Sequence, residues 1–248
     1  DPDFNVQLAE DDYYISMGEG AELLPDKLNI SRAEQEEFAY RSHNRAVAAE
    51  EEGKFDNEII PIILEDGSVF DKDSGPRAPN KEKIESLNPA FRADGTVTAA
   101  TSSPFSIGAS AMLLTSEAYA KEHGLKIRAY IEGRAVAGVN WRMFGSGPVP
   151  ATAKALKNTG LSIDDIDVME INEAFAAQAL YCIKEANWDL DKVNMNGGAV
   201  ALSHPLGISG TRIITTLLNV MEQQDKSVGL ATMCVGTGQG ITTIIKRG

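Results

Sequence analysis

The sequence is poor in cysteine, histidine, aromatic residues and positive charge. It holds two cysteines and three histidines among 248 residues, and aromatic residues make up 6%. Two cysteines cannot build a disulfide framework, and no Cys/His spacing typical of a zinc site occurs. Lysine and arginine number 23 against 36 aspartates and glutamates, a net charge of −13. This balance argues against nucleic acid or an anionic membrane surface as a general partner.

Long hydrophobic runs are also missing, since no apolar stretch approaches the length of a membrane span. Apolar residues make up 43% and charged residues 24%, which is ordinary for a globular protein. We therefore expect no membrane contact, a reducing, cytoplasmic setting, and one large domain or two modest ones. The opening Asp1-Pro-Asp-Phe-Asn5 does not resemble a natural start. We expect further sequence before it.

The first part of the chain, residues 1–104, is polar and predicts a helix-rich cap domain. Ser31 and Glu34 have the spacing of a capping box, and helical spacing of apolar residues continues from there to Glu52. Residues 59–64 form a short apolar run that contains a proline, which is typical of an edge strand. Most charged side chains in this part are those of a solvated face.

From residue 105 to 248, strand and helix patterns alternate, which predicts an α/β core domain. Such an order favours a mostly parallel sheet with helices on both faces, and a sheet of this kind binds ligands at the ends of its strands. The strands are expected at residues 109–115, 127–139, 167–171, 228–235 and 241–246, and the helices at 116–123, 150–159, 173–186 and 208–223.

A glycine-rich stretch at residues 194–210 dominates the second part and contains His204. It leads into the helix expected at 208–223, whose first turn has unpaired N–H groups and the positive end of the helix dipole. A histidine beside such a turn is a candidate acid, base or oxyanion partner. By itself the pattern equally describes a tight turn with a surface histidine.

Three polar or reactive side chains follow predicted strands or turns in this part: Asn172, His204 and Cys234. An amide can orient a water or a carbonyl, an imidazole can donate to an oxyanion, and a thiolate can move a proton. Each has a structural alternative. Asn172 can be the N-cap of the next helix, and Cys234 can be a small buried apolar residue.

Together these loops resemble the thiolases, which exchange acyl groups between coenzyme A thioesters. The resemblance extends over nearly the whole chain, with residues 1–104 similar to part of the thiolase loop domain and 105–248 similar to its C-terminal core. The segments that carry it most specifically are Asn172-Glu-Ala-Phe-Ala, Asn196-Gly-Gly-Ala-Val-Ala-Leu-Ser-His204-Pro-Leu-Gly-Ile-Ser-Gly210 and Gly229-Leu-Ala-Thr-Met-Cys234-Val-Gly236.

The resemblance implies roles for these residues. Asn172 would hold a water that forms an oxyanion hole with His204, and His204 would also activate a nucleophilic cysteine. Cys234 would take the α-proton from the acyl-CoA that becomes the carbanion, and the Gly236 N–H would belong to a second oxyanion hole. The pantetheine and nucleotide tunnel would be lined by Ser103, Arg77 and Phe175. The implied activity is that of an acetyl-CoA C-acetyltransferase, with coenzyme A thioesters as substrates and neither cofactor nor metal.

The sequence departs from the family pattern in several places. Thiolases carry the acyl group on a cysteine within a pattern like Cys-x-Ser-Gly, which neither cysteine here matches, and Cys182 lies in an apolar helix. Ser203 and Thr237 replace glycines. At residues 101–108 the family's Asn-x-Ser-Gly-x-Asn-Asp-Gly becomes Thr-Ser-Ser-Pro-Phe-Ser-Ile-Gly, with Pro104 fixing φ where glycine is free.

We therefore expect this chain to be inactive alone and to need a companion N-terminal half that supplies the nucleophile. Without it, a half-sheet would leave a large apolar face exposed. The resemblance also implies a homodimer or homotetramer. Two alternatives remain open. One is a non-catalytic, CoA-binding pseudoenzyme or assembly subunit, and the other is a relative of the ketoacyl-carrier-protein synthases, which use two histidines.

Overall fold

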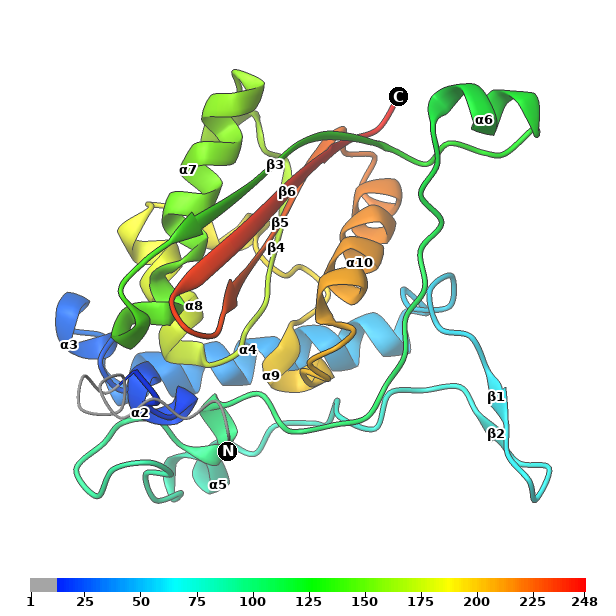
Figure 1. Cartoon of the computed structure of the whole chain (residues 1–248). Coiled ribbons are helices and arrows are strands. Elements are labelled where there is room, and N and C mark those ends of the chain that lie inside the picture. Colours follow the sequence, from blue (N-terminus) through cyan, green and yellow to red (C-terminus); the bar gives the residue numbers. More distant parts are fainter. Residues whose placement is uncertain (1–12) are drawn as a thin grey trace, which may run out of the picture.

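A computed structural model of the chain describes residues 13–248, so the unusual first residues lie outside the described part. Its centre is a four-stranded sheet in the order β3-β6-β5-β4 (Figure 1). The strands run over Tyr130–Gly138 (β3), Gln239–Lys246 (β6), Val228–Val235 (β5) and Val168–Ile171 (β4). The four strands predicted at 127–139, 167–171, 228–235 and 241–246 are confirmed, and β6 begins slightly earlier than expected, at Gln239.

The strand directions correct the expectation of a mostly parallel sheet. Strand β4 pairs with β5 in parallel, whereas β6 pairs with both β5 and β3 in antiparallel fashion. The chain between β5 and β6 comprises residues 236–238, which is long enough for a hairpin and far too short for a parallel crossover. The sheet is mixed, and the α/β class itself is confirmed.

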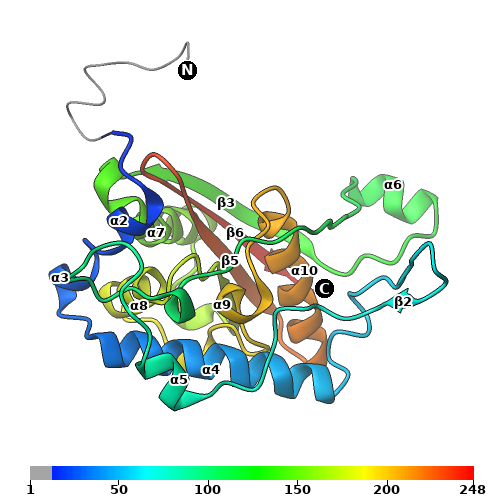
Figure 2. The same cartoon turned by 90° about the horizontal axis from the view of Figure 1, so that it is seen from below.

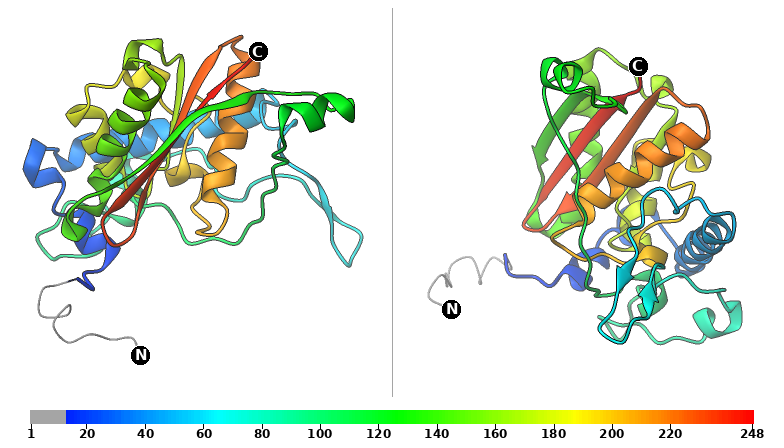
Figure 3. Two further views of the ribbon diagram at one scale, coloured as in Figure 1. Left: turned by 45° about the horizontal axis from the view of Figure 1, so that its top comes forward. Right: turned by 90° about the vertical axis from the view of Figure 1, so that its right-hand side faces the viewer.

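Helices cover both faces of this sheet, as expected (Figure 3). Helices α7 (Pro148–Thr159) and α8 (Ala176–Glu185) lie on one face, and α10 (Ser209–Gln223) lies on the other. Along β4 the side chains alternate between two apolar clusters: Met169 packs with α8 residues, and Val168 packs with α10 residues. All four residues of this strand are buried, as expected for a strand that is covered on both faces.

The cap region is built around the long helix α4 (Arg32–Glu51), which runs beneath the core against α8 and α9 (Ala199–Leu202) (Figure 2). Its capping box at Ser31 and Glu34 is formed as predicted. The predicted edge strand at 59–64 shortens to a two-residue strand in a small hairpin. The other cap elements are α2 (Met17–Ala21), α3 (Pro25–Leu28), β1 (Ile62–Ile63), β2 (Val69–Phe70), α5 (Lys81–Glu85) and the 3-10 turn η1 (Ala99–Thr101).

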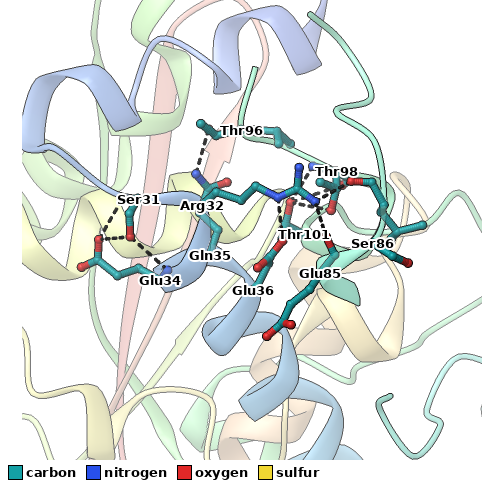
Figure 4. Close-up of polar contacts among 12 residues, drawn as sticks. Ser31, Arg32, Glu34, Gln35, Glu36, Glu85, Ser86, Thr96, Thr98 and Thr101 are labelled. Carbon is teal, nitrogen blue, oxygen red and sulfur yellow. Dashed lines mark hydrogen bonds and ion pairs between the residues drawn. The ribbon is translucent and has the colours of Figure 1, made fainter. Parts of the chain in front are cut away.

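The N-terminal end of α4 is anchored by polar contacts to the end of α5 and to the segment that follows it (Figure 4). Arg32 donates to the Glu85 carbonyl at 3.2 Å, and Gln35 Nε2 donates to Thr96 Oγ1 at 2.9 Å. Carbonyl and hydroxyl acceptors satisfy the polar ends of both side chains, which limits their freedom. The helix is therefore held at a fixed position below the strand ends.

The predicted buried strand at residues 109–115 is wrong. The segment is irregular and exposed, with Leu113 at 75% and Leu114 at 66% relative exposure. A buried strand needs a pairing partner and a packed face, and within residues 13–248 this segment has neither. The helix predicted at 116–123 is present as α6 (Glu117–Glu122) and lies beside the sheet rather than on it (Figure 1).

The remaining turns are short 3-10 helices: η2 (Trp141–Ser146), η3 (Ile163–Asp165) and η4 (Leu190–Lys192). Helix α7 ends at Gly160, as predicted. None of the helices in the described part of the chain is long and apolar enough to cross a membrane.

Candidate functional site

The carboxyl end of β4 places Asn172 in the protein interior. Its backbone N–H donates to the Thr232 carbonyl at 2.9 Å and so extends the pairing with β5 by one residue. The side chain is fully buried, and its Nδ2 lies 3.3 Å from His204 Nε2. The structural alternative, in which Asn172 caps the following helix, is wrong because Phe175 is the N-cap of α8.

His204 follows the short helix α9 and a strained residue. Ser203 has φ 75° and ψ 168°, a conformation that is essentially reserved for glycine. The His204 ring is half-buried, with Nδ1 2.5 Å from Ser209 Oγ at the first residue of α10. Burial, and to a lesser extent the charge of Arg212, hold the pKa of His204 below its ordinary value. The imidazole is therefore neutral at neutral pH.

The residue after Asn172, Glu173, is the centre of a cage of buried hydrogen-bond donors. The Glu173 side chain accepts hydrogen bonds from Ser42 Oγ at 2.7 Å, from Asn194 Nδ2 at 2.7 Å and from the Val200 N–H at 3.1 Å. These donors come from α4, from the glycine-rich turn and from α9. Glu173 therefore joins the cap region, the end of β4 and the turn before His204 through hydrogen bonds to its carboxyl group.

Asn194 and Gly198 complete the cage. Asn194 Oδ1 accepts from the Ile171 N–H at 2.8 Å, and its Nδ2 donates to the Ile171 carbonyl at 2.9 Å, so this side chain clamps the end of β4. A Cβ on Gly198 would lie 2.1 Å from the Glu173 carboxyl carbon. Only glycine lets the turn approach the carboxylate so closely.

Cys234, near the end of β5, lies in an apolar cluster with Phe175, Ala174 and Phe144. Burial raises the pKa of the Cys234 thiol to about 12, so this side chain holds its proton at neutral pH. Within residues 13–248, no side-chain hydrogen bond joins it to Asn172 or His204. Gly236 lies two residues further on, at the start of the exposed turn between β5 and β6.

The residues expected on the coenzyme A side fall into two groups. Ser103 and Phe175 lie together, because Ser102 bridges to Phe175 and Ser103 bonds the Ala174 carbonyl through both its N–H, at 3.0 Å, and its hydroxyl, at 2.9 Å. Arg77 is exposed and donates to the Gly75 carbonyl at 3.2 Å. Gly75 in turn packs against the Ala201 carbonyl of α9, which brings the Arg77 loop beside the His204 turn.

The structure thus joins Asn172 to His204 directly and places Phe175 beside Cys234, while Arg77 lies at the periphery. Sequence reasoning missed Glu173, Ser42 and Ser209. A charged residue inside the apolar run 171–177 was the available signal for Glu173. No cluster of His, Cys, Asp or Glu within residues 13–248 could hold a metal ion.

Family models match both parts of the chain: the thiolase N-terminal domain matches residues 5–118, and the thiolase C-terminal domain matches residues 125–247. A 3-ketoacyl-CoA thiolase of Vibrio parahaemolyticus is 54% identical over 241 residues, which cover 93% of this chain and 61% of that protein. The chain therefore spans about three fifths of the length of the curated relatives it matches.

Solved structures agree. The acetyl-CoA acetyltransferase of Bacillus anthracis superposes with a TM-score of 0.92 at 44% identity, covering 94% of this chain and 60% of that one. Human mitochondrial 3-ketoacyl-CoA thiolase in complex with CoA gives a TM-score of 0.91 at 39% identity, with 94% and 59% covered. Two matching family models, closely similar sequences and a shared fold lead to one conclusion. The chain belongs to the thiolase family.

Proposed function

We propose that this chain supplies the cap and C-terminal core of a thiolase-type acyltransferase, which interconverts a 3-ketoacyl-CoA plus CoA with two shorter acyl-CoA molecules. The observation that carries the proposal is the contact between Asn172 Nδ2 and His204 Nε2 at the end of β4. A buried amide and an imidazole that donates once its Nε2 has taken up a proton suit the stabilisation of an enolate oxygen, worth about 3 kcal/mol for each positioned donor.

In the direction of thiolysis, an acyl-carrying thiolate attacks the 3-keto carbon, and the bond between C2 and C3 breaks. The electron pair remains on the acetyl-CoA fragment as an enolate, whose oxygen Asn172 and His204 stabilise. The Cys234 thiol, whose pKa burial raises to about 12, gives its proton to the enolate carbon. The thiol of incoming CoA then returns a proton to Cys234 as its sulfur takes the acyl group.

The proposal also gives roles to Gly236 and to the residues expected to bind coenzyme A. The Gly236 N–H stabilises the oxyanion of the acyl-cysteine intermediate as that intermediate is attacked. Ser103 and Phe175 line the pantetheine arm, and Arg77 lies toward the nucleotide. Their support is positional, because Ser103 is bonded to the Ala174 carbonyl beside Phe175. Coenzyme A thioesters are the substrates, and the residues in these roles need no cofactor.

We propose that a companion N-terminal core half supplies the acyl-carrying cysteine. Cys182 is unsuitable because it is fully buried in α8, where burial raises the pKa of its thiol strongly. Exposed apolar side chains at residues 104–114, including Phe105 and Ile107, support an extensive partner surface. In this arrangement residues 1–104 act as the cap and 105–248 as one core half of an oligomeric enzyme.

An assay of acetoacetyl-CoA cleavage tests this function. The chain is purified alone and together with the segment encoded immediately before it, which we expect to contain Cys-x-Ser-Gly. Activity is expected only for the combination. Cleavage by residues 1–248 alone would overturn the need for a companion. A preceding segment without that cysteine, joined to an inactive but CoA-binding protein, would favour the pseudoenzyme instead.

Two histidine variants test the role of His204 in the active combination of this chain and its companion segment. His204→Gln is expected to lower kcat by about 10²- to 10⁴-fold, the usual contribution of an acid/base group. His123→Gln is the matched control, because His123 lies exposed at the C-terminal end of α6 and stacks on Tyr119. A series of 3-ketoacyl-CoA substrates measured with the same protein separates the acetoacetyl-CoA type from enzymes for longer chains.

A further inference from the structure

Ser209, the first residue of α10, makes two hydrogen bonds that together constrain where protons lie. Its Oγ is 2.5 Å from His204 Nδ1 and 3.1 Å from the Pro205 carbonyl oxygen. A hydroxyl has one proton to donate, whereas a carbonyl oxygen accepts only. If the Ser209 proton points to the Pro205 carbonyl, the hydroxyl accepts from the ring, and the Nδ1 atom must carry a proton.

The other side of the ring gives the same result. Asn172 Nδ2 faces His204 Nε2 at 3.3 Å, and an amide nitrogen only donates. A protonated Nε2 would set two donors against each other. The opposite arrangement requires the Asn172 amide to be turned over, so that its oxygen, which has no hydrogen-bond partner here, accepts from the ring and its N–H groups lose the ring as an acceptor. It also places lone pairs of Ser209 Oγ and the Pro205 carbonyl in contact.

We propose that Ser209 is a positioning residue that holds the neutral His204 ring as the Nδ1–H tautomer, with the lone pair on Nε2. Ser209 is only 1% exposed, so water does not compete for its hydroxyl. The short helix turn fixes it further, because the Ile208 N–H donates to the same Pro205 carbonyl at 3.1 Å. The proton on one imidazole nitrogen is set by the bond at the other, and here a hydroxyl makes that bond.

The consequence rests on the proposed function. With its lone pair on Nε2, His204 is ready to take the proton of the acyl-carrying thiol. The Nε2–H that forms then becomes a donor toward an oxyanion. One ring thereby serves both steps without a ring flip, because Nδ1–H stays bonded to Ser209 Oγ throughout. Replacing the hydroxyl frees the ring to adopt the other tautomer.

The tautomer is measured by NMR on the full chain labelled with ¹⁵N-histidine, with His204 assigned from the signal lost in His204→Gln. The expected wild-type result is a proton on Nδ1 and an unprotonated Nε2. Ser209→Ala should shift His204 toward Nε2–H, and Ser209→Thr should restore Nδ1–H by restoring the hydroxyl. Thr215→Ala, which removes a hydroxyl bonded to a carbonyl of the same helix, is the matched control and should change nothing.

An Nε2–H tautomer in the wild-type chain would overturn the proposal, and this measurement requires no variant to fold. An unchanged tautomer in folded Ser209→Ala would overturn the role of the hydroxyl. In the active combination with the companion segment, Ser209→Ala should lower kcat by about tenfold or more at an unchanged KM, with recovery in Ser209→Thr. If the tautomer is as expected and no thiolase activity exists, the proposed function fails and the assignment of Ser209 stands.

Discussion

Two buried glutamates only three residues apart behave in opposite ways. Glu173 lies just beyond β4 and accepts three hydrogen bonds, from Ser42, Asn194 and the Val200 N–H. Glu170 lies within β4 and is equally buried, yet neither of its carboxyl oxygens has a hydrogen-bond partner within the described residues. Its nearest cation is Arg212, whose Nη1 is 3.9 Å away.

The difference follows from the direction in which each side chain points. Glu170 alternates with Met169 and faces α10, where burial raises its pKa well above the ordinary value. Glu173 has left the strand and points into a turn whose N–H and amide groups converge on it. A carboxylate remains ionised in an interior only where donors replace its water. The same residue type therefore joins three segments through hydrogen bonds at position 173, and is buried without a hydrogen-bond partner among the described residues at position 170.

The largest effect should come from breaking the cage. Glu173→Ala leaves three buried donors without an acceptor, and we expect it to lower the free energy of unfolding by about 3–5 kcal/mol in urea titrations. Glu185→Ala, on the exposed side of α8, is the control and should stay within about 0.5 kcal/mol of wild type. A loss below about 1 kcal/mol for Glu173→Ala would mean that the cage stabilises nothing.

A smaller effect should come from relieving the backbone strain at Ser203. Ser203→Gly places a residue that tolerates φ 75° and ψ 168° after α9, and should raise the free energy of unfolding by about 1 kcal/mol. Ser227→Gly is the control, because Ser227 has no positive φ. Thermal unfolding compares the two, and a destabilised Ser203→Gly would show that its side chain matters more than its backbone.

A third carboxyl group extends the comparison to pH. Glu58 accepts from Thr216 Oγ1 at 3.1 Å, its other oxygen is unpaired, and burial raises its pKa to about 7. A raised pKa stabilises the fold at low pH, and this stability is lost as pH rises from about 4.5 through 7. Glu58→Gln should therefore match wild type at pH 5 and exceed it at pH 8.

The expected gain at pH 8 is about 1 kcal/mol, since solvent screens this half-buried group below the 1.4 kcal/mol that each pKa unit would give. Unfolding curves at both pH values measure it. Glu51→Gln, at the exposed end of α4, should show no such difference between the two pH values. A gain at pH 5 as large as at pH 8 would contradict the ionisation argument.

The smallest effect is expected at Glu170. Burial raises its pKa well above the ordinary value and so favours the protonated carboxyl group, which a Gln side chain resembles; Glu170→Gln should therefore change stability by less than about 0.5 kcal/mol at pH 7. As pH rises, the wild-type chain should lose stability relative to the variant, because only the wild type can ionise. Glu173→Gln is the counterpart and should cost more at pH 7. Equal losses in the free energy of unfolding for the two variants would contradict the proposed difference between Glu170 and Glu173.

Local pattern was sufficient for much of the core. Predominantly apolar runs located β4 and β5, most of whose residues are buried, and the capping box located the start of α4. The buried strand predicted at 109–115 was wrong because a buried strand needs a neighbouring strand and a packed face, which local sequence does not specify. The prediction of a mostly parallel sheet was wrong because the alternation of strands and helices was given more weight than the short link between β5 and β6. That link is long enough only for a hairpin.

The site was predictable only in part. The glycines and the strand ends pointed to Asn172 and His204, and the structure joins them. Glu173 was not predicted, because its partners are remote in sequence and a buried carboxylate cannot be told from an exposed one by residue type. Ser209 was not predicted either, since a serine at the start of a helix is expected to cap it.

The cage also constrains how the chain reaches its native state. The bond from Ser42 to Glu173 closes 131 residues of chain, and the bond from Gly198 to Ser42 closes 156. Contacts of such long range bear a large loop-closure entropy and form after local ones. We expect substitutions at Ser42 to accelerate unfolding and leave the folding rate nearly unchanged. The strand ends would then acquire their final geometry in the last step of folding, when α4 docks.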